Sequence, residues 1–174
     1  MSNISKQGVI SSSGSPNPNL AINSVRNISP NASYNIANFN TSKELTAGVK
    51  FTVTIKGVIG ENKQFGLWMG GGYSSCGFFT NNGNGIFTLT FTSPATVAGN
   101  GSRTAINIYA YPSSNSNLSS LEWLKLEEGS VPTLWIPNEN DADFVSDNCG
   151  FIEINDNCKI QKNGYIQANE FIEI

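Results

Sequence analysis

The segment TAINIYAYP, at residues 104–112, places side chains that could bind a sugar on one face of a strand. Asn107, Tyr109 and Tyr111 occupy alternate positions in it, and Trp68 and Tyr73 lie in a second aromatic segment. Aromatic rings stack on the apolar C–H faces of sugars, and amides match sugar hydroxyls. These five residues are the predicted glycan-binding set. The alternative, which the sequence leaves open, is that the rings pack against a neighbouring subunit or a second sheet.

The acidic segment NENDAD, at residues 138–143, is the second candidate site. Glu139, Asp141 and Asp143 alternate in it, and carboxylate oxygens are the ligands that Ca²⁺ prefers. The segment lacks the turn glycine of an EF-hand loop, so a solvated exit loop is the competing interpretation. No cofactor other than Ca²⁺ is expected.

Enzymatic residues are scarce. The chain contains no histidine, which excludes Ser-His-Asp and Cys-His catalytic sets. The Gly-rich segments do not precede a helix, and the carboxylates gather near strand ends and tails rather than in pairs, so we expect no enzyme.

Three cysteines without histidine make a zinc site improbable. A Cys149–Cys158 disulfide is conceivable, but three reduced thiols are favoured for Cys76, Cys149 and Cys158.

The composition excludes two classes of partner. Only 13% of the residues are charged and the formal net charge is −3, whereas a nucleic-acid surface needs clustered Lys and Arg. No apolar run approaches the roughly 18 residues that cross a bilayer. The first residues lack the apolar segment of a signal peptide, which predicts synthesis in a cytoplasm.

The elements that must position these residues alternate with the period of strands. In segment 47–59, polar residues alternate with the apolar residues Val49, Phe51, Val53 and Ile55. The same alternation recurs in segments 85–93 and 104–112. Segments 64–69 and 120–127 are also of strand size, and Gly/Asn/Ser turns separate all of them. The sequence therefore predicts an all-β protein, an antiparallel β-sandwich of jelly-roll type.

Both ends of the chain differ from the middle. ISKQGVISSS (4–13) and IQKNGYIQAN (160–169) are weak repeats that each read as a small hairpin, and a lone hairpin is marginal in water. They either extend the edge of the sandwich or pair with another subunit or partner, and we favour assembly. The predicted organisation is an N-terminal arm and linker (1–17), a sandwich (18–141) and a C-terminal β-arm (142–174).

The stretch SLEWLKLEEGSVPTLWIPNEND, at residues 120–141, has its own physical interpretation. Leu124 and Leu126 face one way on a strand, and the charges on the other face are expected to be solvated. Gly129 permits a turn, after which Trp135 folds back as a lid over the sandwich end. The tryptophans are expected to belong mostly to the core.

The same stretch resembles the last strand and exit loop of the carbohydrate-binding-module-like β-sandwich found in structural proteins of tailed bacteriophages. That family runs aromatic-x-K-L-E-x-G, then T-x-W-x-P and acidic residues. The matching positions here are Trp123, Lys125, Leu126, Glu127, Gly129, Thr133, Trp135, Pro137, Glu139 and Asp141. Residues 18–24 and 45–55 are similar to the family's opening segment and an early strand, with Phe51 replacing the usual tyrosine.

The resemblance implies a virion protein, made in the host bacterial cytoplasm and exposed on the virion surface as a head fibre, a decoration or a tail appendage. It implies a homo-oligomer, for which a trimer is the working guess, attached to other virion proteins through the terminal arms and binding a cell-surface glycan. The alternative is a purely structural adaptor sandwich that binds no sugar, because sandwiches host both roles.

Overall fold

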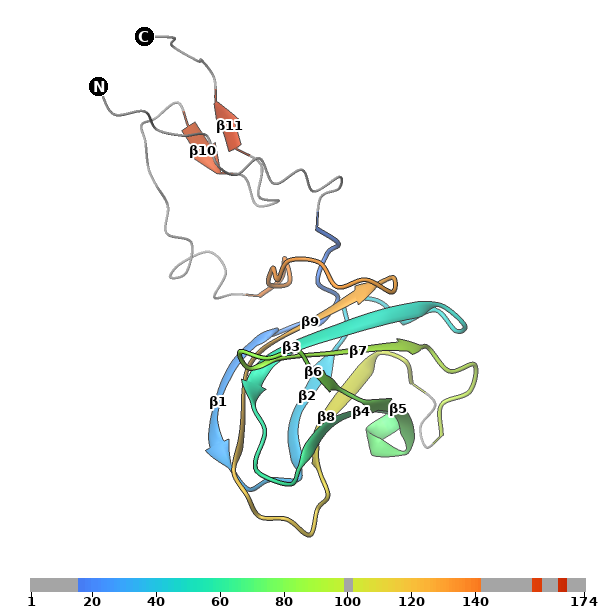
Figure 1. Cartoon of the computed structure of the whole chain (residues 1–174). Coiled ribbons are helices and arrows are strands. Elements are labelled where there is room, and N and C mark those ends of the chain that lie inside the picture. The colour runs from blue at the N-terminus through green and yellow to red at the C-terminus, as the bar shows by residue number, and fades with distance from the viewer. Residues whose placement is uncertain (1–15, 99–101, 142–157, 161–165, 169–174) are drawn as a thin grey trace, which may run out of the picture.

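The computed structural model describes residues 16–98 and 102–141, together with two short strands at 158–160 and 166–168. The chain is all-β, as predicted, and its strands form two packed antiparallel sheets (Figure 1). The first sheet has the order β1-β9-β3-β7-β6 and the second β2-β8-β4-β5. Their bounds are β1 Val25–Asn31, β2 Asn35–Asn40, β3 Lys50–Val58, β4 Gln64–Met69, β5 Ser74–Phe78, β6 Thr80–Asn81, β7 Ile86–Thr92, β8 Ala105–Tyr111 and β9 Ser119–Glu128.

The core lies between the two sheets and is built by the alternation seen in the sequence. Phe51, Val53 and Ile55 of β3 are fully buried, and Val53 pairs with Leu89 of β7 and Leu126 of β9 in the register of the sheet. The opposing sheet supplies the buried side chains Phe39, Phe65, Leu67, Met69, Ile106 and Ile108. Each such side chain contributes about 1.5–3 kcal/mol through burial, so the two inner faces hold the sandwich together.

The five strand-sized segments singled out in the sequence correspond to β3, β4, β7, β8 and β9. Strands β1, β2, β5 and β6 were not expected. Strand β1 pairs with β9 through two register shifts, and β5 pairs with β4 through one, so neither shows a clean alternation. Segment 70–75, expected to be a turn, is instead a short 3₁₀ helix (Gly70–Gly72) followed by the start of β5.

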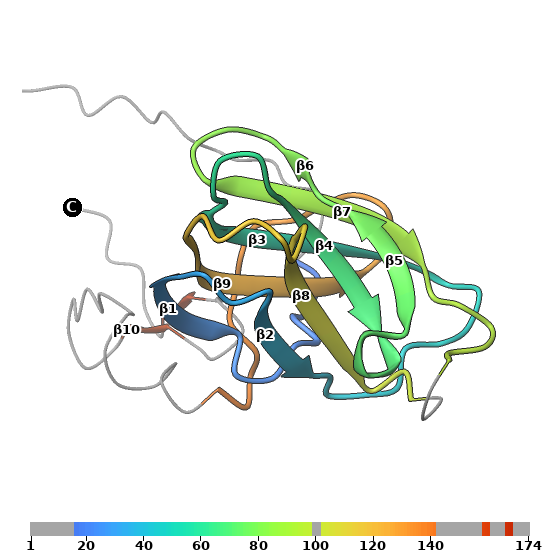
Figure 2. The ribbon, with the colours of Figure 1, turned by 90° about the horizontal axis from the view of Figure 1, so that it is seen from below.

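The layers are clearest from the side of the four-stranded sheet. Figure 2 shows β2, β8, β4 and β5 side by side in the nearer layer, with β9, β3 and β7 behind them. The outer face of the nearer sheet therefore points away from the rest of the sandwich. No helix among the described residues is long and apolar enough to cross a bilayer.

Part of the predicted C-terminal arm can be compared with the structure. Strands β10 (Cys158–Ile160) and β11 (Ile166–Ala168) pair antiparallel, with Ile160 opposite Ile166, which is the hairpin pairing predicted for 160–169. The rest of this arm, and the N-terminal arm up to residue 15, lie outside the described residues. The assembly role of both arms remains a prediction.

Candidate functional site

The outer face of the four-stranded sheet carries a group of aromatic side chains, here called the aromatic face: Tyr34, Trp68, Phe78, Tyr109 and Tyr111. Strand alternation puts them there. In β8 the buried Ile106, Ile108 and Ala110 face the core, which turns Tyr109 and Tyr111 outward. In β4, Phe65 and Leu67 face the core and Trp68 faces out.

The five rings form a closed circuit of contacts. Ring centroids are separated by 5.6 Å between Trp68 and Phe78 and by 5.5 Å between Phe78 and Tyr111. Tyr34 lies 6.5 Å from Tyr111 and 4.8 Å from Tyr109, which in turn lies 5.1 Å from Trp68. The planes are inclined to each other by 50° to 83°, so the face is a rough surface of ring faces and edges rather than a flat platform.

Gly66 makes this packing possible. It lies on β4 between Tyr109 of β8 and Phe78 of β5 in the register of the sheet. A Cβ atom at this position would lie 2.2 Å from Cζ3 of Trp68 and 3.1 Å from Cδ1 of Phe78. The indole ring therefore lies directly over the backbone of Gly66, where any side chain would displace it.

Uncharged polar groups accompany the rings. Asn107 is buried beside Trp68 in the register, and its Nδ2 donates a hydrogen bond to Oδ1 of Asn38. Among the described residues, Oδ1 of Asn107 has no hydrogen-bond partner, which leaves a buried acceptor on the outer side of the sheet. Gln64 is exposed opposite Tyr111. These amides offer donors and acceptors of the kind that sugar hydroxyls use.

The rings of the aromatic face differ in how exposed they are. Phe78 and Tyr111 are 41% and 42% exposed, whereas Trp68 and Tyr109 are more covered. Burial, with a further contribution from Tyr34, raises the pKa of Tyr109. Phe78 and Tyr111 thus offer the most accessible stacking surface.

Four of the five predicted glycan-binding residues come together in this way. Trp68, Tyr109 and Tyr111 belong to the aromatic face, and Asn107 lies beside them. Tyr73 is 75% exposed and makes no ring contact with the described aromatic residues. Its neighbour Gly72 approaches Tyr109 so closely that a Cβ would lie 2.4 Å from the hydroxyl oxygen. Tyr73 therefore follows directly after a backbone segment that contacts the aromatic face.

Tyr34 and Phe78 are not among the predicted site residues. Tyr34 immediately precedes β2, and Phe78 ends β5, two strands that the sequence pattern did not predict. The aromatic residue that ends the segment SSCGF was the available signal for Phe78, but its use depended on knowing that this segment pairs with β4.

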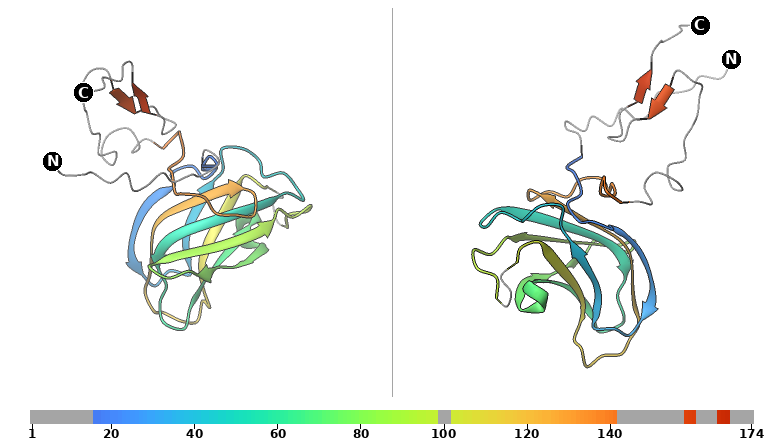
Figure 3. Two further views of the ribbon diagram at one scale, coloured as in Figure 1. Left: turned by 45° about the horizontal axis from the view of Figure 1, so that its top comes forward. Right: turned by 180° about the vertical axis from the view of Figure 1, so that it is seen from behind.

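Residues 120–141 lie on the opposite side of the sandwich, and their structure differs from the one predicted. Residues 129–141, here called the strap, cross the outside of the five-stranded sheet (Figure 3). Trp123 and Trp135 lie 5.1 Å apart and are only partly buried, outside the core between the sheets. The prediction that the tryptophans are mostly core is therefore wrong, although Trp135 does fold back over the sheet.

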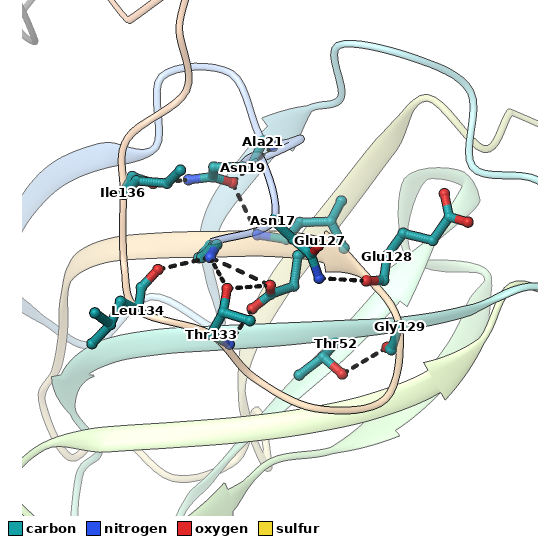
Figure 4. Close-up of polar contacts among 12 residues, drawn as sticks. Asn17, Asn19, Ala21, Thr52, Glu127, Glu128, Gly129, Thr133, Leu134 and Ile136 are labelled. Carbon is teal, nitrogen blue, oxygen red and sulfur yellow. Dashed lines mark hydrogen bonds and ion pairs between the residues drawn. The ribbon is translucent and has the colours of Figure 1, made fainter. Parts of the chain in front are cut away.

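The charges beneath the strap are not solvated, contrary to expectation. Lys125 and Glu127 have side chains that are 0% exposed, with 3.3 Å between Nζ and Oε2. The carboxylate of Glu127 accepts hydrogen bonds from the backbone N–H and hydroxyl of Thr133, at 2.8 and 2.6 Å, and Nζ of Lys125 donates to the carbonyl of Leu134 at 2.7 Å (Figure 4). Burial lowers the pKa of Lys125, and the neighbouring Glu127 opposes this effect.

The predicted calcium ligands do not converge among the described residues. Asp141 is buried, and its carboxylate accepts hydrogen bonds from the backbone N–H groups of Asn23 and Ser24, at 2.5 and 2.8 Å, and from the Ser24 hydroxyl. Glu139 is exposed, and Asp143 lies outside the described residues. Within 16–98 and 102–141, no three His, Cys, Asp or Glu side chains are placed to hold a metal ion. Asp141 thus closes the strap onto the start of the sandwich.

Of the three cysteines, only Cys76 has a side chain that the structure describes. Cys76 is a free thiol that packs against the core, and burial raises its pKa to about 12. Cys149 and the side chain of Cys158 lie outside the described residues, so their pairing remains a prediction.

Comparison with known proteins gives no further identification. No family model matches the sequence, and neither the curated proteins nor the solved structures contain a significant match. The resemblance to phage sandwiches therefore rests on the motifs in residues 18–24, 45–55 and 120–141.

Proposed function

We propose that this protein is a non-catalytic structural protein of a tailed-phage virion whose sandwich binds glycan through the aromatic face. The observation that carries the binding proposal is the closed circuit of five aromatic rings on an outer sheet face, with Phe78 and Tyr111 accessible. A buried amide acceptor lies within the same strands. Apolar stacking surface beside a few directional polar groups is the usual composition of a sugar site.

The virion assignment is supported by the motif of residues 120–141 and by the predicted arms. Lys125, Glu127 and Thr133, three residues of the motif, build the buried network under the strap. Their role is therefore to close the sandwich, and they are not candidates for ligand contact. The proposal includes a homo-oligomer, with a trimer as the working model, attached through the terminal arms.

One observation favours the alternative, a structural adaptor that binds no sugar. Val131 and Leu134 of the strap are exposed apolar side chains on the side opposite the aromatic face. Exposed apolar surface is typical of protein contacts when it forms a patch. An adaptor would use this side, the aromatic face or both for neighbouring subunits.

A glycan array probed with the full-length protein and its variants tests the proposal. Phe78→Ala and Tyr111→Ala should each weaken binding about fivefold, since one stacked ring contributes about 1 kcal/mol. Val131→Ala, an exposed apolar truncation on the other side, is the matched control and should leave binding unchanged. A blank array with correctly folded protein, together with a changed oligomeric state in Phe78→Ala and Tyr111→Ala, would replace the glycan proposal with the adaptor.

A further inference from the structure

The four strands that carry the aromatic face contain no charged residue. Strands β2, β8, β4 and β5 read NIANFN, AINIYAY, QFGLWM and SSCGF, without Asp, Glu, Lys or Arg. The five-stranded sheet differs, because β1, β3 and β9 hold Arg26, Lys50, Lys56, Glu122, Lys125, Glu127 and Glu128. The charged residues of the strands are thus confined to one of the two sheets.

The cations beside the uncharged strands bind backbone carbonyls or a carboxylate. Arg26 donates to the carbonyl of Asn38 at 2.6 Å and lies over the ring of Phe39, a core side chain, at the edge of the sheet. Lys63, which precedes β4, donates to the carbonyl of Asn115 at 2.6 Å. Arg103, which precedes β8, pairs with Glu44 at 2.7 Å. None of the three is directed at the aromatic face by the contacts that it makes.

From this separation of charge we infer that the ligand of the aromatic face is an uncharged polysaccharide, and this inference rests on the proposed function. A carboxylate or phosphate placed against these rings would lose water without gaining a cationic partner. The faces of aromatic rings also carry partial negative charge, so they attract sugar C–H groups and repel anions. Neutral hydroxyls, in contrast, match the amides of Asn38, Gln64 and Asn107.

The inference also predicts how binding responds to salt. Interactions between exposed charges weaken as the Debye length falls from about 10 Å at 0.1 M salt to about 3 Å at 1 M. Stacking and neutral hydrogen bonds carry no such dependence. Binding to the aromatic face should therefore change less than twofold over this range of salt concentration.

Affinity electrophoresis and titration calorimetry of the full-length protein provide the test. The probes are neutral polysaccharides (β-glucan, mannan, galactan and methyl-esterified polygalacturonate) and acidic ones (unesterified polygalacturonate, alginate and hyaluronan). At least one neutral probe should bind, with affinity lowered about fivefold by Phe78→Ala or Tyr111→Ala and unchanged by Val131→Ala. The acidic probes should not bind.

Three results would contradict the inference, and they are distinguishable. Binding of acidic probes alone, lost in Phe78→Ala and weakened by salt, overturns the neutral ligand but keeps the aromatic face as a glycan site. Neutral binding that neither variant lowers places the ligand elsewhere on the molecule. If none of the polysaccharides binds, the proposed glycan function fails and the inference fails with it.

Discussion

Removing the cation of the buried pair under the strap should destabilise the protein strongly. In Lys125→Met, the carboxylate of Glu127 keeps its two hydrogen bonds from Thr133 but loses its counter-charge in a site with no exposure to water. Breaking a fully buried pair from one side costs about 3–5 kcal/mol. Since domains have a total stability of about 5–15 kcal/mol, the loss is a large fraction of it.

Urea denaturation measures this loss. With a slope of about 2 kcal/mol per molar urea for a domain of this size, a cost of about 4 kcal/mol lowers the midpoint by about 2 M. Fluorescence is a suitable signal, because the Trp123 and Trp135 rings, 5.1 Å apart, separate when the strap leaves the sheet. The double variant Lys125→Met/Glu127→Gln removes the stranded charge and should recover part of the stability.

The matched control is an exposed pair on the same sheet. Lys56 on β3 and Glu122 on β9 lie 3.6 Å apart with side chains 40% and 51% exposed. Exposed pairs contribute about 0.2–1 kcal/mol, so Lys56→Met should move the midpoint by less than about 0.5 M. A Lys125→Met midpoint as high as that of Lys56→Met, or a double variant no more stable than Lys125→Met, would refute the role given to the buried pair.

Three further predictions concern single residues. Gly66→Ala should displace the Trp68 ring, at a cost of about 1–3 kcal/mol visible as a lower Tm and an altered near-UV circular dichroism spectrum, and an unchanged spectrum would contradict the packing. Asp141→Asn should cost about 1–3 kcal/mol in urea denaturation, because an amide has one acceptor oxygen for the donors of Asn23 and Ser24, and a loss below about 0.5 kcal/mol would show that the carboxylate is not needed. Cys76, in a variant whose other cysteines are serine, should react with iodoacetamide at pH 8 roughly 1,000-fold more slowly than in urea, since burial raises its pKa from 9.0 to about 12. The native state then binds the thiol proton more tightly, so the stability that Cys76 contributes below pH 9 is lost as pH rises towards 12. Fast labelling of Cys76 in the folded protein would contradict the burial of this side chain.

Alternation made the central strands predictable. In β3, β7 and β8, apolar residues at every second position specify which face is buried, and the structure agrees residue by residue for Phe51, Val53 and Ile55. The edge strands lack this information. Strand β5 is built from SSCGF, in which apolar and polar residues do not alternate, and its place in the sheet comes from pairing with β4.

The candidate site could be predicted only where its residues lie on a strand with regular alternation. Tyr109 and Tyr111 share an outward face because β8 is regular, and this needed only the local sequence. Phe78 joins them from a strand that local patterns did not predict, and Gly66 matters only because Trp68 folds over it. The burial of Lys125 and Glu127 depends on Thr133 and Leu134, which return over the sheet. It is a tertiary effect, whereas the charged residue types alone predict exposure to solvent.

Fastening of the chain where it enters and leaves the sandwich has a mechanical consequence. Asn19 donates to the carbonyls of Leu124 and Ile136, and Asp141 holds the backbone of Asn23 and Ser24, so the entering and leaving segments are tied to each other. A pull applied between residues 16 and 141 would load these few side-chain bonds one after another. The aromatic face belongs to the other sheet and makes none of these bonds, so tension borne by the chain would open the strap before it distorted the sheet that carries the rings.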